Sequence, residues 1–248
     1  MGDETDSVAA RFVYRRPVLK LSGEMLAGDG SCGLKRATFQ SIARRVVAVQ
    51  RAGVQVSIVV GGGNIFRGGR NEFPEIPQTT ADDMGMLATL INALALREYI
   101  AALGAPATVL SAIEAPKIAE RFTARLARRL LGEGHVLVLA AGTGNPFFTT
   151  DTAAALRAAE IGADVLLKAT NVDGVYSDDP RRNRNAVKFT VLDYQRVVSE
   201  NLKVMDTAAV AICRDAGIPI IVFDLKRKDS ITLALQGKPV GTFVGGKR

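Results

Sequence analysis

The hydrophobic positions of this chain fall into two patterns that alternate along its length. Short runs of consecutive apolar residues are typical of strands buried on both faces, and they occupy residues 17–21, 54–60, 107–110, 135–140, 165–167, 219–223 and 242–244. Apolar residues three or four positions apart predict amphipathic helices over residues 34–53, 82–103, 120–131, 152–161, 202–216 and 230–236. This alternation predicts an α/β fold, a three-layer α/β/α sandwich with a mostly parallel central sheet.

The length of 248 residues suits one sizeable domain or two closely joined lobes. Residues 1–14 begin polar and acidic, and we expect a mobile tail there before a single domain over 15–248. The most loop-like interior segment, 178–185, is a candidate mobile flap. No apolar run approaches the ~20 residues that span a bilayer, and the start does not resemble a signal peptide, so we expect a cytoplasmic protein.

Composition narrows the class of protein. The net charge is +7, but the basic residues are spread over several elements and Trp is absent, whereas nucleic-acid-binding proteins tend to gather basic and aromatic residues. Solvated helix faces and some phosphate ligands account for this charge, so we do not expect nucleic acid as a partner. Cys32 and Cys213 lack metal or redox spacing, and we expect one loop residue and one buried helix residue.

The loops that follow the strands hold the candidate chemistry, because ligands of open α/β sheets bind beyond the carboxyl ends of the strands. Those loops are residues 22–24, 61–69, 142–151 and 168–171, and the first three are rich in glycine. Glycine lets backbone N–H groups approach an anion closely, and the start of a following helix adds a favourable dipole. Three such loops at one sheet edge predict a site for several phosphates.

Lys20 and Lys168 each stand at the end of an apolar strand. A buried ammonium group is costly unless it meets an anion, although a lysine that extends to the surface would explain either residue alone. Because both lysines adjoin loops of the ligand-binding type, we interpret them as clamps on phosphates that neutralise charge during phosphoryl transfer.

Several other chemistries do not fit the sequence. No GxxxxGK[ST] motif occurs, so the chain is not a P-loop NTPase, and Phe66 occupies the third glycine position of a GxGxxG dinucleotide motif. The single histidine, His135, begins a strand away from every loop, so histidine acid–base catalysis is not expected. A kinase whose acceptor is a phosphate needs no base, because its nucleophile is already an anion.

The loop before the helix at 152 has an unusual composition. Pro146, Phe147 and Phe148 predict a stiff, partly apolar wall that suits a flat base and a ribose. The next three residues, 149–151, can each cap the helix, and capping alone is one explanation for them. Asp206, at another helix start, is either a solvated charge or a partner that orients the two lysines.

These residues resemble the bacterial UMP kinases (uridylate kinases) of the amino acid kinase family. The similarity runs in order from about Arg16 to Val244, and its most specific part is Gly-Thr-Gly-Asn-Pro-Phe-Phe-Thr-Thr-Asp at 142–151. The other matching motifs are Leu-Lys-Leu-Ser-Gly-Glu at 19–24, Gly-Gly-Gly-Asn at 61–64 through Arg-Gly at 67–68, Asp-Met-Gly-Met-Leu-Ala at 83–88, Lys-Ala-Thr at 168–170 with Val-Asp-Gly-Val at 172–175, and Leu-Lys-Val-Met-Asp at 202–206.

The resemblance implies an amino acid kinase fold that transfers the γ-phosphoryl group of ATP to UMP, with a UMP-binding lobe at 15–164 and an ATP-binding lobe at 165–248. Lys20 and Lys168 would stabilise the transferring group, and Arg67 would reach the phosphates of both nucleotides. Asp151 and Asp206 would order the lysines and the Mg²⁺-bound phosphates, and no residue is implied as a direct metal ligand.

The resemblance also implies the residues that contact each nucleotide. Those for ATP are Lys20, Leu21, Ser22, Gly23, Gly63, Arg67, Thr170, Tyr176 and Asp179. Those for UMP are Gly62, Asp82, which would hold the ribose, Thr143, Gly144, Asn145, Pro146, Phe147, Phe148, Thr149 and Thr150.

Members of the family are typically homohexamers that UTP inhibits and GTP often activates, and the resemblance implies the same for this chain. Between Arg67 and Asp82 the family usually carries Gly-Met and a basic residue, whereas residues 71–78 read Asn-Glu-Phe-Pro-Glu-Ile-Pro-Gln. That segment lies near subunit contacts in the family, so the departure bears on assembly and effector response. The loop at 28–33 is a further candidate for effector signalling.

Two alternatives remain open. A kinase for a carboxylate or carbamate, such as an amino acid kinase, would share the fold, although the wall at 145–150 favours a nucleotide acceptor. A non-catalytic nucleotide-binding regulator would keep the fold and lose the chemistry, although Lys20, Lys168, Asp151 and Asp206 are all present.

Overall fold

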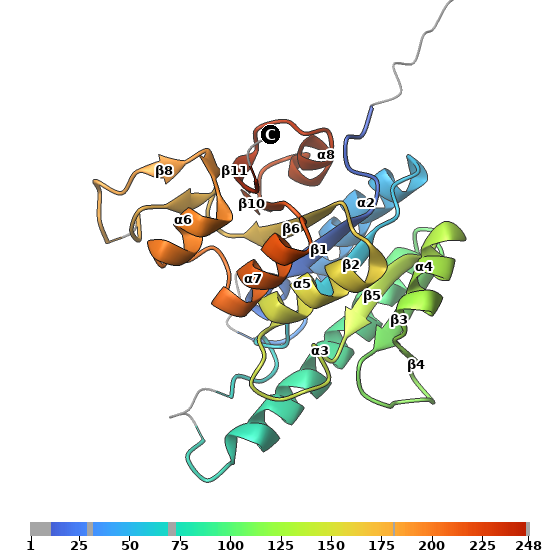
Figure 1. The fold of residues 1–248 in the computed structure, drawn as a ribbon. Helices are drawn as coiled ribbons and strands as arrows, with labels where there is room; N and C mark the ends of the chain where they lie inside the picture. Colours follow the sequence, from blue (N-terminus) through green and yellow to red (C-terminus); the bar gives the residue numbers. More distant parts are fainter. Residues whose placement is uncertain (1–10, 29–31, 69–72, 181, 247–248) are drawn as a thin grey trace, which may run out of the picture.

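The computed structural model describes residues 11–28, 32–68, 73–180 and 182–246, which form a nine-stranded sheet in the order β4-β3-β5-β2-β1-β6-β10-β11-β9 (Figure 1). Neighbouring strands are parallel except β10 and β11. The strands are β1 (Pro17–Leu21), β2 (Ser57–Val60), β3 (Ala107–Ser111), β4 (Glu120–Arg121), β5 (Val136–Ala140), β6 (Val165–Thr170), β9 (Val191–Leu192), β10 (Ile220–Asp224) and β11 (Gly241–Val244). A separate antiparallel pair consists of β7 (Val175–Tyr176) and β8 (Lys188–Phe189).

Helices cover both faces of the sheet, which confirms the predicted α/β/α layers. One face packs against α1 (Gly23–Leu26), α2 (Arg36–Arg51), α3 (Gln78–Ala101) and α8 (Ser230–Leu235). The other face packs against α4 (Ala124–Gly132), α5 (Thr150–Ile161), α6 (Tyr194–Ser199) and α7 (Thr207–Asp215).

The two faces of β1 show how the sheet positions the chemistry. Leu19 and Leu21 lie in the core beneath α2 and α3, whereas Val18 lies in the core beneath α5. Because side chains alternate along a strand, Lys20 shares the α5 face with Val18. The sequence places a charged residue there at the point where the strand ends, so it can extend from the core toward the sheet edge.

Some predicted boundaries were wrong. The helix predicted over 120–131 begins only at Ala124, after Thr123 caps it, and residues 120–121 form the edge strand β4. The helix predicted over 202–216 begins at Thr207, because Asp206 is the residue that caps it. Three apolar residues before it, at 202, 204 and 205, are buried but not helical, and their spacing led to the wrong prediction of a helical turn there.

The chain packs against the domain before residue 15. The backbone N–H groups of Val13 and Tyr14 donate to the Leu235 carbonyl at 2.9 and 3.1 Å, and the Tyr14 side chain is buried. Residues 1–10 of the expected tail lie outside the described residues, as do parts of the segments at 28–33, 71–78 and 178–185.

The remaining composition-based predictions concern cysteine and membranes. Cys32 is an exposed loop residue and Cys213 a buried helix residue, as predicted. Among the described helices, none is long and apolar enough to cross a membrane.

Candidate active site

Two lysines and one aspartate lie together where β1 and β6 meet the start of α5. Lys20 and Lys168 are partners in the register of the two parallel strands, so their side chains leave the same face side by side. Asp151, in the first turn of α5, lies between them, with its Oδ1 2.8 Å from Lys20 Nζ and its Oδ2 2.7 Å from Lys168 Nζ. The structure therefore brings together three of the predicted catalytic residues.

The charges in this cluster are not balanced. Burial acts to raise the pKa of Asp151, but the ion pairs with Lys20 and Lys168 outweigh it and hold that pKa below its ordinary value. Burial lowers the pKa of Lys168; Asp151 offsets part of this, and the neighbouring Lys20 ammonium lowers the pKa further. Two buried ammonium groups share one carboxylate, so an added phosphate would stabilise both.

A second cluster joins the first turns of α5 and α7. Thr149 caps α5, accepting from the N–H groups of Asp151 and Thr152, and its hydroxyl donates to Asp206. The Thr152 hydroxyl lies 2.8 Å from Asp206 Oδ2, and Asp206 caps α7 by accepting from Ala209 N at 2.8 Å. Asp206 thus contacts threonines, not the lysines, and acts on Lys168 only through its charge.

Close packing explains two glycines in the loops that the sequence analysis interpreted as anion-binding. A Cβ on Gly23 would lie 2.4 Å from Gly63 N, and a Cβ on Gly62 would lie 2.8 Å from the Gly85 carbonyl of α3. By contrast, of the residues that the structure describes, a Cβ on Gly63 would meet only the Arg67 side chain, at 3.6 Å. Packing therefore does not require a glycine at position 63, and we attribute this glycine to access for a ligand.

A cavity of about 570 Å³, here called the first cavity, lies on one side of the lysine pair. It contains five of the nine residues implied for ATP: Lys20, Ser22, Thr170, Tyr176 and Asp179. Leu21 does not line it, because the side chain lies in the core, and Gly23, Gly63 and Arg67 are also outside its lining. Tyr176 donates to Asp173 at 2.7 Å, and Lys188 pairs with the other oxygen of Asp173 at 2.7 Å, so the hairpin of β7 and β8 is fastened internally.

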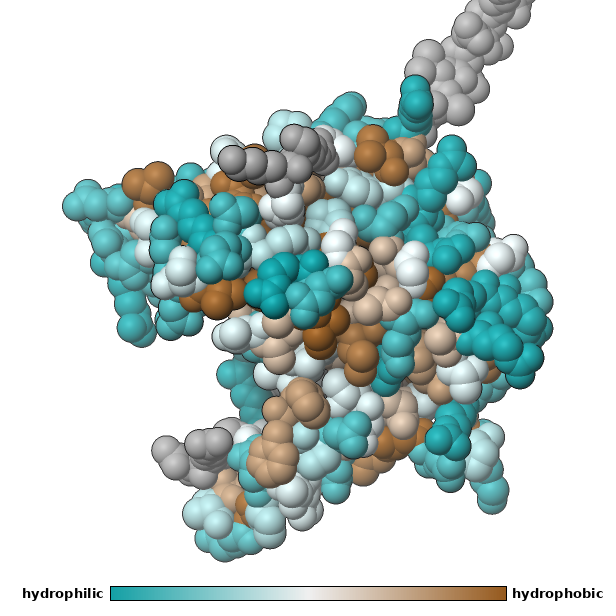
Figure 2. All heavy atoms as spheres, viewed as in Figure 1, coloured by the Kyte–Doolittle hydropathy of each residue, from teal (hydrophilic) through white to brown (hydrophobic). Residues whose placement is uncertain are grey.

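A cavity of about 650 Å³, here called the second cavity, adjoins the first at Glu24, which lines both. Seven of the ten residues implied for UMP line it: Gly62, Asp82, Thr143, Asn145, Phe148, Thr149 and Thr150. Gly63 and Arg67 line this cavity as well. Figure 2 shows the molecule hollowed on its left side, between α6 and the β7–β8 hairpin above and the start of α3 below.

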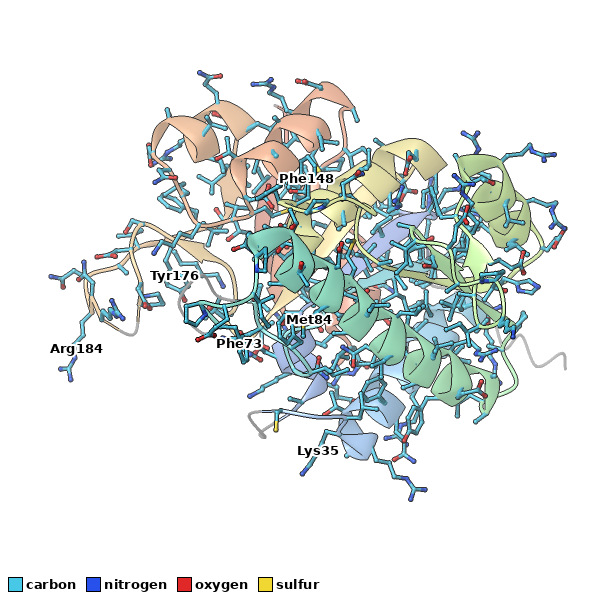
Figure 3. All side chains as sticks on the ribbon, turned by 90° about the horizontal axis from the view of Figure 1, so that it is seen from below. Lys35, Phe73, Met84, Phe148, Tyr176 and Arg184 are labelled. Carbon is cyan, nitrogen blue, oxygen red and sulfur yellow. The ribbon has the colours of Figure 1, made fainter. Side chains whose placement is uncertain are left out.

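The predicted aromatic wall is only partly formed. Phe148 lines the second cavity, but Pro146 does not, and Phe147 points outward and is largely exposed. Phe147 adopts a left-handed conformation, with φ of 69°, and its N–H donates to Asp82 Oδ2 at 2.8 Å. In Figure 3, Phe148 lies beside the start of α3, whereas Tyr176 lies on the hairpin of the first cavity.

Two residues around the cavities were not predicted from the sequence as site residues. Glu24 lines both and pairs with Arg67, and Lys203 adds a third lysine to the first cavity. Both lie within motifs that the sequence singled out, but nothing in the local pattern indicates which way their side chains point. His135 lies away from both cavities, with its Nδ1 2.9 Å from the Thr108 hydroxyl.

Comparison with known proteins gives a consistent result. A family model described as the amino acid kinase family matches residues 15–224. A curated protein named uridylate kinase from Xanthomonas axonopodis pv. citri is 49% identical over 234 residues, which cover 94% of this chain and 98% of the relative.

Solved structures agree with that match. The UMP kinase of Bacillus anthracis superposes with a TM-score of 0.91 at 34% identity, covering 95% of this chain and 97% of that structure. The UMP kinase of Ureaplasma parvum gives a TM-score of 0.88 at 36% identity, covering 94% and 99% of the two chains.

Proposed function

Because the chain belongs to the amino acid kinase family, we propose that it is a UMP kinase, which transfers the γ-phosphoryl group of ATP to UMP. The observation that carries this proposal is the pair of lysines held by Asp151 at the first of two adjoining cavities of nucleotide size. ATP occupies the first cavity and UMP the second, so the γ-phosphate of ATP lies beside Lys20 and Lys168 and faces the phosphate of UMP.

The chemistry follows from the charges. The bond between the γ-phosphorus and the bridging oxygen of ADP breaks as an oxygen of the UMP phosphate bonds to the phosphorus. Negative charge on the transferring group is stabilised by Lys20 and Lys168, which the structure holds in place before the substrates arrive. The acceptor oxygen carries no proton to be removed, so the site needs no general base.

Other residues bind and orient the two nucleotides. Arg67, which pairs with Glu24 where the two cavities approach each other, is free to exchange that carboxylate for phosphate oxygens. Thr149 and Thr150 present the start of α5 to the UMP phosphate. Asp82 already accepts from the Phe147 N–H, so it orders the loop that surrounds UMP in addition to its proposed contact with the ribose.

A divalent metal accompanies ATP in kinases of this kind, and we propose Mg²⁺. Among the described residues, no group of three or more His, Cys, Asp or Glu side chains could hold a metal. These residues fit a Mg²⁺ ion that binds mainly through the ATP phosphates, since Mg²⁺ commonly keeps phosphate and water ligands and takes few ligands from the protein. The ion would neutralise phosphate charge.

We also propose the lobe division at 164/165. The second cavity is lined by residues between 24 and 150, whereas most of the first cavity is lined by residues between 168 and 203. The exceptions are residues 20, 22, 24 and 25, at the end of β1 and the start of α1, which line the first cavity from within the N-terminal lobe. A single continuous sheet runs through both lobes.

A homohexamer inhibited by UTP and activated by GTP remains a proposal, as does a cytoplasmic role in pyrimidine nucleotide biosynthesis. Leu87 and Ile91 support an assembly, because they lie one turn apart on α3 with 52% and 48% of their surfaces exposed. Phe73, within the segment that departs from the family, stacks on Phe66 at 5.5 Å, so this segment is tied to the loop after β2. Sedimentation of the chain with and without UTP and GTP tests assembly and effector binding together.

An acceptor screen tests the proposed function. ADP release is measured by a coupled assay with UMP, CMP, dUMP and acidic amino acids, each with ATP and Mg²⁺. We expect UMP to give the highest kcat/KM. Turnover with an acidic amino acid instead of UMP would indicate the amino acid kinase alternative, and binding of nucleotides without turnover would indicate a regulator.

A further inference from the structure

Helix α3 carries a buried polar side chain at Thr89 that the proposed reaction does not use directly. The Thr89 hydroxyl donates to the Met86 carbonyl at 2.8 Å within the helix and accepts from Ala141 N at 2.7 Å. Ala141 is the first residue after β5, and its φ of 60° turns the chain into the loop that lines the second cavity. Thr89 thus fixes the point where this loop leaves the sheet.

A second buried polar side chain, Asn92, lies almost one turn further along α3. Its Nδ2 donates to the Gly61 carbonyl at 2.7 Å and to Asn64 Oδ1 at 2.7 Å, and its Oδ1 accepts from Asn64 Nδ2 at 3.0 Å. Asn64 Nδ2 also donates to the Gly33 carbonyl at 2.9 Å. Asn92, which is fully buried, therefore fixes both ends of the glycine loop that follows β2.

The hydrogen bonds of Thr89 and Asn92 reach the loops at the ends of two neighbouring strands. β2 and β5 pair in parallel, so their carboxyl ends lie side by side, and the loops that leave them form two walls of the second cavity. The rest of the buried surface of α3 nearby is apolar, at Ala88, Leu90 and Ala93. Burying a hydroxyl and an amide in such a surface is costly unless their hydrogen bonds are satisfied, and here the partners are these two loops.

We propose that Thr89 and Asn92 are positioning residues that set the separation of the two loops and so determine affinity for the acceptor nucleotide. This inference rests on the proposed function, since it takes the second cavity as the UMP site. Thr89 lines the second cavity, but its hydroxyl is engaged by Met86 and Ala141, and Asn92 is not part of the lining. Loss of either hydrogen bond would let one loop move relative to the other, while the lysine pair, built on β1 and β6, would stay in place.

Thr89→Val and Thr89→Ser form a matched pair that distinguishes the effect of losing the hydroxyl from the effect of changing the packing. Valine keeps the shape and leaves the Ala141 N–H without its acceptor, whereas serine keeps the acceptor. We expect Thr89→Val to raise KM for UMP on the order of tenfold, with KM for ATP within about twofold of the native value. Thr89→Ser should restore KM for UMP, and Asn92→Leu should act like Thr89→Val.

Ser57→Ala is the control, because the Ser57 hydroxyl is fully buried on β2 and has no hydrogen-bond partner in the described part of the chain. It should leave both KM values unchanged. Amide hydrogen exchange supplies a readout that needs no turnover: the peptide that begins at Ala141 should lose protection in Thr89→Val and keep it in Thr89→Ser.

Equal increases of both KM values in Thr89→Val, or unchanged exchange at Ala141, would overturn the positioning role. Native protein without UMP turnover would instead refute the proposed function, and the exchange measurement would still decide whether Thr89 holds the loop.

Discussion

Asp151→Asn is the substitution that tests the active-site electrostatics most directly. Asparagine keeps the shape of the side chain but removes the carboxylate that lies 2.8 Å from Lys20 and 2.7 Å from Lys168. Breaking a buried ion pair by removing one partner costs about 3–5 kcal/mol, because the other charge stays buried without compensation. Loss of a negative charge from the first turn of α5 adds about 0.3–1 kcal/mol.

The pH dependence of this variant has a definite sign. Without the carboxylate, the pKa of Lys168 falls further below its ordinary 10.5, since burial and Lys20 both act in that direction. Between the folded and unfolded pKa values the unfolded chain binds more protons, so stability of the variant rises as pH increases through that window. For the native protein, the depressed pKa of Asp151 stabilises the fold above its ordinary 3.8, and this contribution is lost as pH falls through the folded pKa.

Thermal unfolding and coupled ADP release measure these effects. We expect a lower unfolding midpoint for Asp151→Asn near neutral pH and a larger gain on adding ATP than the native protein shows, because phosphates replace the missing charge. We expect kcat to fall on the order of 10²-fold, since the lysines lose their fixed geometry.

The matched control is Asp193→Asn. Asp193 caps α6, accepting from the Arg196 N–H at 2.7 Å, and asparagine caps a helix equally well, so midpoint and kcat should stay native. If Asp151→Asn kept the native midpoint and turned over within about twofold of the native rate, the carboxylate would not order the lysines.

Two further predictions concern the lysines and the glycine loop. Lys168→Met should retain UMP binding by calorimetry yet lose turnover on the order of 10²-fold or more; near-native activity would remove Lys168 from the mechanism. Gly62→Ala should destabilise the fold by about 1–3 kcal/mol in urea unfolding, since its Cβ would lie 2.8 Å from Ala88 Cβ. Gly63→Ala should leave stability native and raise KM for the nucleotides, and equal stability losses in the two variants would contradict the distinction between packing and access.

The sequence predicted the elements whose pattern persists over several residues. The runs that became β1, β5 and α2 needed no tertiary information, because consecutive apolar residues or helical spacing mark them out. The strands β7, β8 and β9 have two residues each, too few to show any period. Residues 202–206 misled the prediction because their burial follows from the path of the chain and not from a helix.

The sequence indicated candidate residues for the site, but it indicated few of the contacts between them. Lys20 and Lys168 stood out because a charge ends an apolar strand in both cases, but their pairing depends on β1 and β6 being neighbours. The hydrogen bonds of Asp206 to Thr149 and Thr152 join residues more than 50 positions apart, which no local pattern reveals. The role of Gly62 was likewise hidden, since it depends on how closely α3 crosses the loop.

Because Glu24 lines both the first and the second cavity, one molecule could occupy both of them. A compound that links uridine to adenosine through a short chain of phosphates would gain from tethering, since binding of either end raises the effective concentration of the other. Its affinity would depend on the number of linking phosphates, with an optimum where the linker matches the span between the two nucleosides. In a series of such compounds, the linker length that binds most tightly would therefore report the distance that the phosphoryl group travels.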